Sequence, residues 1–140
     1  MANVLLISHD EVLGKAYRAR LAKEGLCLEQ RSFAHEGLAK ARQWTPDLIL
    51  LDLMLPGMHG LDVLKALRDV PWLVKVPVVL LIERTAIRET IEECLVWGAG
   101  SCLYKDRASL EELVAHLRTV LQPGSSAVAL ASASVVRSTD

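Results

Sequence analysis

The stretch DLILLDLMLPGMHG, residues 47–60, decides the fold of this chain. The four aliphatic residues from Leu48 to Leu51 predict a strand that is covered on both faces, because such strands carry continuous apolar runs. Asp52 ends the run, and Pro56-Gly57 predicts a turn soon after it. Since a buried carboxylate needs a partner, the stretch predicts a polar site at the end of a buried parallel strand.

Apolar runs alternate with helical patterns on both sides of this stretch. The predicted strands are residues 4–7, 26–31, 48–51, 77–82 and 101–104, and the predicted helices are residues 11–24, 34–43, 61–70, 85–97 and 109–121. This alternation implies a parallel sheet with helices on both faces, and right-handed crossovers make the α/β fold doubly wound. In such folds the functional site lies at the carboxyl ends of the strands.

The length and composition suit one compact domain followed by a different segment. The chain has 140 residues, of which 51% are hydrophobic and 4% aromatic, so Leu, Val, Ile and Ala should build the core. We predict that residues 1–122 form the domain. Residues 123–140, PGSSAVALASASVVRSTD, are rich in Ser, Ala and Val without a clear period, which favours a disordered tail or a linker.

Charge and cysteine content argue against several classes of protein. The formal net charge is −1 with both signs interspersed, so neither nucleic acid nor a membrane is expected to bind directly. No signal peptide is evident, and no segment is long enough to span a bilayer. Cys27, Cys94 and Cys102 have no CxxC spacing, which favours buried reduced thiols over a disulfide framework or a zinc site. A cytoplasmic location is therefore expected.

Polar residues follow several of the predicted strands. Ser8, His9 and Asp10 follow the first strand, Asp52 ends the third and Lys105 follows the fifth. Lys105 is the obvious partner for the Asp52 carboxylate. The spacing alone leaves open whether the two make a plain ion pair or a reactive site.

Three segments together resemble the receiver domains of two-component response regulators. They are LILLDLMLPGMHGLDVLKALR at residues 48–68, PVVLLIER at residues 77–84 and GAGSCLYKDRASLEELVAHLRTVL at residues 98–121. The resemblance extends from about Asn3 to Leu121. It implies a flavodoxin-like, five-stranded parallel sheet in the order 2-1-3-4-5, and a role in signalling, not in enzymatic catalysis.

The resemblance also implies a phosphoryl-transfer site. In the family, an aspartate attacks a phosphoryl group from a histidine kinase or a small phosphodonor, and Mg²⁺ neutralises the transferring oxygens. A lysine holds these oxygens, and a Ser or Thr hydroxyl and an aromatic residue then report the phosphorylated state. Asp52 matches the phosphoacceptor and Lys105 the lysine, while Met54 stands where a backbone carbonyl would ligate the metal.

The acidic metal-binding pair of the family falls on Ser8 and His9. Ser8 is a weak neutral ligand and His9 prefers softer metals, which leaves Asp10 and Asp52 as the carboxylates of a poor Mg²⁺ site. No cofactor is expected, unless the phosphorylation site works and takes Mg²⁺. Three roles remain open for His9: a general base or phospho-carrier, a Zn²⁺ or Mn²⁺ ligand with Asp52, or a polar residue filling the space of a lost carboxylate.

The switch residues of the family are replaced as well. The hydroxyl position falls on Ile82 and the aromatic position on Cys102, and we expect Tyr104 to face away from the side of Cys102. Glu83 puts a negative charge at the mouth of the site, which should discourage an anionic donor. Because charge stabilisation dominates phosphoryl transfer, phosphorylation of Asp52 is expected to be slow or absent.

Receivers commonly signal through the face made by their fourth helix, fifth strand and fifth helix, here residues 85–97, 101–104 and 109–121. Val96, Trp97, Tyr104 and Arg107 are the predicted partner-binding residues. An exposed Trp can anchor an interface, although Trp97 is as readily placed folded back over the core edge. The expected partners are a signalling protein or histidine kinase, a second copy of this chain, and an output domain after Asp140.

Three functions follow from these observations. The first is an atypical receiver that acts mainly as a phosphorylation-independent interaction or dimerisation module. The second is a working phosphoacceptor, with Asp52 phosphorylated by a histidine kinase and a weakened dependence on Mg²⁺. The third is a small doubly wound enzyme using His9 and Asp52, which no cofactor loop or nucleophile elbow supports.

Overall fold

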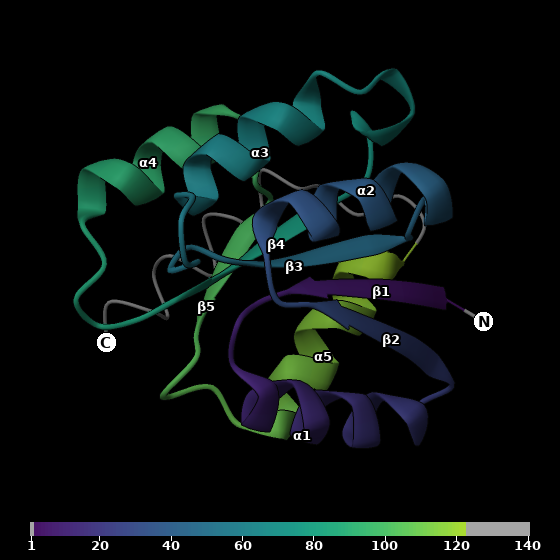
Figure 1. Ribbon diagram of the computed structural model, residues 1–140. Coiled ribbons are helices and arrows are strands. Elements are labelled where there is room, and N and C mark those ends of the chain that lie inside the picture. The colour runs from purple at the N-terminus through teal and green to yellow at the C-terminus, as the bar shows by residue number, and fades with distance from the viewer. Residues whose placement is uncertain (1, 123–140) are drawn as a thin grey trace.

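The computed structural model describes residues 2–122, so the predicted tail at residues 123–140 lies outside the described part. Five parallel strands form one sheet in the order β2-β1-β3-β4-β5, as predicted (Figure 1). The strands are β1 (Ala2–Ile7), β2 (Leu26–Arg31), β3 (Leu48–Asp52), β4 (Val78–Ile82) and β5 (Ser101–Tyr104). The helices are α1 (Glu11–Ala22), α2 (Ala34–Trp44), α3 (Gly60–Arg68), α4 (Arg88–Val96) and α5 (Leu110–Leu121), with a 3₁₀ turn η1 (Pro71–Leu73).

Helices cover both faces of the sheet. Figure 1 shows α2, α3 and α4 on one face and α1 and α5 on the other. Along β3, Leu48 and Leu50 pack on the α1–α5 side, while Ile49 and Leu51 pack on the α2–α4 side. Every residue of β3 and β4 is buried. The continuous apolar runs of these strands therefore reflect burial on both faces, as the sequence predicts.

Two helix starts test the local sequence signals. Ser109, the first residue of the helix predicted at residues 109–121, is the N-cap of α5, and its hydroxyl accepts a hydrogen bond from the Glu112 N–H at 3.1 Å. Helix α4 begins at Arg88 and not at the predicted Thr85, because Ile87 has extended backbone with φ −78° and ψ 127°. Residues 85–87 thus belong to a loop at the carboxyl end of β4.

The prediction that Tyr104 faces away from the side of Cys102 is wrong. Both side chains belong to the cluster on the α2–α4 face of the sheet. Successive side chains of a strand point to opposite faces, so residues two apart share a face.

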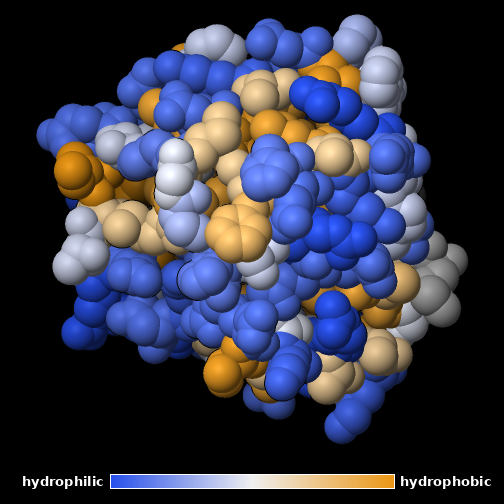
Figure 2. All heavy atoms as spheres, in the orientation of Figure 1, coloured by the Kyte–Doolittle hydropathy of each residue, from blue (hydrophilic) through white to orange (hydrophobic). Residues whose placement is uncertain are grey.

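The surface carries mixed polarity. Figure 2 shows a mainly hydrophilic face with small apolar areas between the polar groups. None of the helices within residues 2–122 has the length and apolar character needed to cross a lipid bilayer.

Candidate functional site

Asp52 lies at the carboxyl end of β3, where it is 1% exposed. Its Oδ1 accepts a hydrogen bond from the Met54 N–H at 2.9 Å. Its Oδ2 accepts two, from the Ser8 hydroxyl and from the Lys105 ammonium, both at 2.8 Å. The carboxylate is thus held by one cation and two neutral donors, which satisfies a buried charge without a metal ion.

Ser8 reaches Asp52 because β1 and β3 are neighbours. Ile7 pairs with Leu51 in the parallel register, so the next residues, Ser8 and Asp52, come side by side. Ser8 is completely buried, and its Oγ also accepts from the Asp10 N–H at 3.1 Å. A hydroxyl has one proton to donate, and here that proton goes to Asp52.

The other two residues of the β1–α1 loop have different contacts. His9 is exposed, with its ring centroid 5.9 Å from that of Phe33. The Asp10 carboxylate accepts from the Leu13 N–H at 3.0 Å and so caps α1. Neither side chain is among the hydrogen-bond donors to the Asp52 carboxylate, which are Met54, Ser8 and Lys105.

These contacts do not fit a Mg²⁺ site. Hard Mg²⁺ takes oxygen ligands with carboxylate charge, and Ser8 offers a hydroxyl that already donates to Asp52. Among residues 2–122, no three His, Cys, Asp or Glu side chains come close enough to hold a metal ion. The geometry therefore does not support the predictions that His9 or Asp10 binds a metal ion together with Asp52.

Lys105 approaches Asp52 from the other side of β4. Its ammonium lies 2.8 Å from Asp52 Oδ2 and 3.3 Å from Glu83 Oε1, so it bridges two carboxylates. Burial alone lowers the pKa of Lys105, but the hydrogen bonds and charges of Asp52 and Glu83 outweigh it, and the pKa is raised. Lys105 therefore stays cationic at neutral pH.

The two switch positions are part of the hydrophobic core. Ile82 and Cys102 are both almost completely buried in the cluster on the α2–α4 face. Ile82 carries no hydroxyl that could follow a phosphoryl group, and Cys102 carries no ring. Tyr104 is only partly buried, and the Arg107 guanidinium lies 5.6 Å from the centre of its ring.

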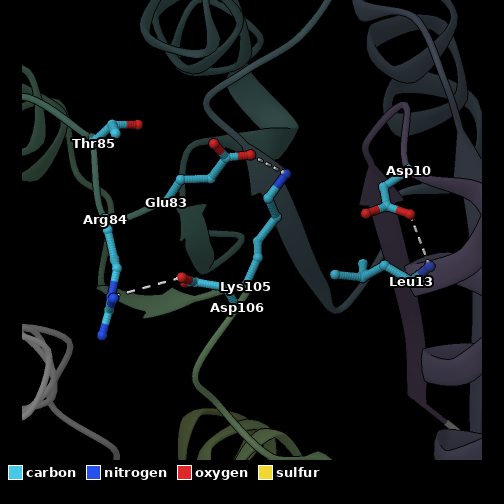
Figure 3. Close-up of a pocket in the computed structure, with 7 residues that line it drawn as sticks. All are labelled: Asp10, Leu13, Glu83, Arg84, Thr85, Lys105 and Asp106. Carbon is cyan, nitrogen blue, oxygen red and sulfur yellow. Dashed lines mark hydrogen bonds and ion pairs between the residues drawn. The ribbon is translucent and has the colours of Figure 1, made fainter.

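A polar cleft of about 340 Å³ opens beside these residues. Figure 3 shows Asp10 and Leu13 on one side of it, and Glu83, Arg84, Lys105 and Asp106 on the other, with Thr85 at the edge. Both charge signs line the cleft, and each acidic group in it already has a partner.

Two residues that hold the site were missed by the sequence analysis. Gln30 Nε2 donates to the backbone carbonyls of Ser8 at 2.9 Å and of Asp10 at 3.1 Å, and so fixes the β1–α1 loop. A Cβ at Gly14 would lie 1.8 Å from Gln30 Oε1, so the glycine leaves room for this side chain. The only sequence signal was a glycine inside a helix, because the contact joins β2 to α1 across the fold.

The predicted partner-binding residues lie apart in the fold. Val96 is 83% exposed at the end of α4. The Trp97 ring lies 5.4 Å from the Lys65 ammonium of α3, so it is partly covered from that side. Tyr104 is the last residue of β5, and Arg107 follows in the loop before α5. Their role in binding stays a prediction.

Comparisons with known proteins agree with this architecture. The family model described as "Response regulator receiver domain" matches residues 4–118. The chain is 36% identical over 120 residues to the "Probable transcriptional regulatory protein TcrX" of Mycobacterium tuberculosis, covering 85% of this chain and 49% of that protein. It is 33% identical over 120 residues to the "DNA-binding response regulator MtrA" of Mycolicibacterium smegmatis, covering 85% of this chain and 50% of that protein.

Among solved structures, the chemotaxis response regulator CheY4 of Vibrio cholerae superposes with a TM-score of 0.77 at 28% identity, covering 84% of this chain and 97% of that one. The chain thus spans about half the length of the curated relatives it matches, but nearly all of this structural neighbour. Strand order, the carboxylate at the end of β3 and the matched family model lead to one conclusion. The chain belongs to the response regulator receiver domain family of two-component signalling.

Proposed function

We propose that this receiver domain signals through protein contacts, without metal-dependent phosphorylation of Asp52. One observation carries the proposal: the buried hydroxyl of Ser8 donates to Asp52 Oδ2 at 2.8 Å, at the position where the family places a carboxylate. Receiver domains in general bind Mg²⁺ at their phosphorylation site. Here a neutral donor stands in that place, and it supplies no charge for a hard cation.

The transferring group would meet too little positive charge at this site. Phosphoryl transfer depends on cationic groups that stabilise the charge of the transition state. Lys105 is the cation in contact with Asp52, and it is already shared with Glu83. A slow or absent reaction is the expected consequence.

The residue that would transmit a phosphorylation signal is also changed. Ile82 is buried in the apolar cluster at the position where the family has its switch hydroxyl. A phosphoryl group on Asp52 would therefore find no hydroxyl there to pull inward. This supports a signal that does not depend on phosphorylation.

The proposal is tested by exposing the chain to acetyl phosphate at millimolar Mg²⁺ and measuring its intact mass. We expect no phosphoryl adduct on the natural chain and a clear adduct on a Ser8→Asp/His9→Asp variant. The variant should also be less stable without Mg²⁺, because the carboxylate added at position 8 would face Asp52, and Mg²⁺ should raise its melting temperature.

A matched control for this assay is the same double variant with Asp52→Asn, which should gain no adduct. Ready modification of Asp52 in the natural chain would overturn the proposal. It would favour the second candidate, a phosphoacceptor with weakened Mg²⁺ dependence, which is supported by the 2.8 Å contact of Lys105 with Asp52.

The partners we propose follow from the family and its named relatives. Receiver domains are signalling modules that work with histidine kinases. Several relatives are named as transcriptional or DNA-binding regulators, and this chain spans about half their length. We propose that its signal passes to an output domain of that kind. We also propose that Val96, Trp97, Tyr104 and Arg107 take part in protein contacts.

A further inference from the structure

Glu83 is the first residue after β4, and its carboxylate points at the Lys105 ammonium (Figure 3). The Oε1–Nζ distance is 3.3 Å, while the same ammonium lies 2.8 Å from Asp52 Oδ2. Lys105 is mostly buried, so it has little room to exchange these partners for water. The Lys105 ammonium is therefore already paired with two carboxylates, and one of them, Glu83, is not the phosphoacceptor.

The fold brings Glu83 and Lys105 together through the register of β4 and β5. Ile82 pairs with Tyr104, and the Lys105 N–H donates to the Ile82 carbonyl at 2.8 Å. One residue further along each segment, Arg84 and Asp106 form a second ion pair at 3.9 Å. Two ion pairs thus join the segment after β4 to the segment after β5, and they hold Glu83 beside Lys105.

Glu83 also lines the two cavities beside the site. It lines the polar cleft of about 340 Å³ and a second, more apolar cavity of about 300 Å³. The second cavity is lined by Leu53, Met54, His59, Glu83, Thr85, Ala86, Ile87 and Thr90. The side chain is 46% exposed, so its carboxylate faces the solvent side of Lys105.

We propose that Glu83 is a built-in anion that occupies Lys105 and keeps external phosphate groups and phosphodonors away from Asp52. The inference rests on the proposed function and names the residue that closes the site. In a transfer from acetyl phosphate, an Asp52 oxygen forms a bond to phosphorus while the bond from phosphorus to the acetyl oxygen breaks. Acetate leaves with the electron pair, and the transferred dianionic group must lie against Lys105, where Glu83 repels it.

The first test uses inorganic phosphate and the natural metal-free chain. Phosphate is titrated while the amide signals of Met54 and Lys105 are followed by NMR. We expect Glu83→Gln to bind phosphate about two- to fivefold more tightly, in the range measured for a partly exposed ion pair. The advantage should shrink at about 0.5 M salt, where charges are screened, whereas a purely structural effect would not respond to salt.

Glu93→Gln is the matched control, because it removes the same charge from a surface pair with Lys65 at 3.8 Å. It should bind phosphate as the natural chain does. Equal phosphate affinity for Glu83→Gln, Glu93→Gln and the natural chain would overturn the role of Glu83.

The second test separates this inference from the proposed function. Glu83→Gln is added to the Ser8→Asp/His9→Asp variant, and the rate of modification by acetyl phosphate with Mg²⁺ is measured. A rate about two- to fivefold above the parent variant supports the role of Glu83. An unchanged rate would show that Glu83 does not have this role, and it would not affect the proposed loss of the Mg²⁺ site. Ready modification of the natural chain overturns the proposed function, and an equal rate in Glu83→Gln then overturns the role of Glu83 as well. If the parent variant does not fold, the phosphate titration decides the role of Glu83.

Discussion

At the scale of single residues, two buried hydroxyls, those of Ser8 and Tyr17, differ in whether they have hydrogen-bond partners. The Ser8 hydroxyl donates to Asp52 and accepts from the Asp10 N–H, so its capacity is used. Tyr17, on α1, is 4% exposed, and its hydroxyl is the buried side-chain polar atom within residues 2–122 that has no hydrogen-bond partner. A polar group left in this state costs stability, and its ionisation costs more.

Tyr17→Phe should change how stability depends on pH. Burial, followed by the charges of Asp10 and Asp52, raises the pKa of Tyr17 from 10.0 to about 12. A group with a raised folded-state pKa contributes stability that is fully present below pH 10 and is lost as the pH rises towards 12. This loss should be about 2–3 kcal/mol and should be absent in Tyr17→Phe.

Urea unfolding between pH 9 and 12 checks this prediction. Lys105, whose pKa is also raised, loses its contribution in both proteins and cancels in the comparison. Tyr104→Phe, which changes a partly exposed ring, is the control, and its free energy of unfolding should still fall between pH 10 and 12 as in the natural chain. Parallel curves for Tyr17→Phe and the natural chain would show that the Tyr17 phenol is not held neutral by the fold.

At the scale of elements, one side chain joins α3, η1 and α4. Arg68, in the last turn of α3, donates to the backbone carbonyls of Leu73, Val74 and Val76 around η1. It also donates to the carbonyls of Trp97 and Gly98 at the end of α4. Burial lowers the pKa of Arg68 from its usual value, but a guanidinium remains charged at any physiological pH.

Replacing Arg68 should destabilise this end of the domain. We expect Arg68→Lys and Arg68→Met each to lower the free energy of unfolding by about 2–4 kcal/mol, because the planar fork of donors is lost and carbonyls lose their partners. Urea unfolding measures the change. Arg42→Lys, at an exposed arginine of α2, should stay within about 0.5 kcal/mol. A lysine that replaces Arg68 without loss would show that the fork is not needed.

At the scale of the whole molecule, the sheet divides the core into two layers that share no helix. The polar cleft lies at the carboxyl edge of the sheet. Arg68 and the exposed Val96 lie on the α3–α4 side of the fold instead. An exposed valine next to a partly covered tryptophan is the kind of surface that protein contacts use.

Val96→Lys tests this surface without disturbing the fold. Because Val96 is 83% exposed, the substitution should change the free energy of unfolding by less than about 0.5 kcal/mol. We expect weak, concentration-dependent self-association of the natural chain in sedimentation velocity, and its loss in Val96→Lys. Identical sedimentation of the two chains up to millimolar concentration would remove Val96 from the proposed contact surface.

Much of this protein was determined by the sequence alone. The runs at residues 48–51 and 77–82 fixed two central strands, because full burial on both faces leaves no polar positions. Asp52 and Lys105 were identified at the strand ends, since the carboxyl ends of parallel strands meet at one edge. Local signals were less reliable for the start of α4, where loop residues 85–87 have no strong helix-breaking residue.

Only the tertiary structure decided how these groups are connected. The use of Ser8 as a donor to Asp52, of Asp10 as a helix cap and of Glu83 as a second anion on Lys105 depends on side-chain directions and on strand register. Gln30 over Gly14 and Arg68 across α4 join residues from different elements. Hydrophobic periodicity specifies which face of an element is buried, but hydrogen bonds act over about 3 Å and depend on where distant segments meet.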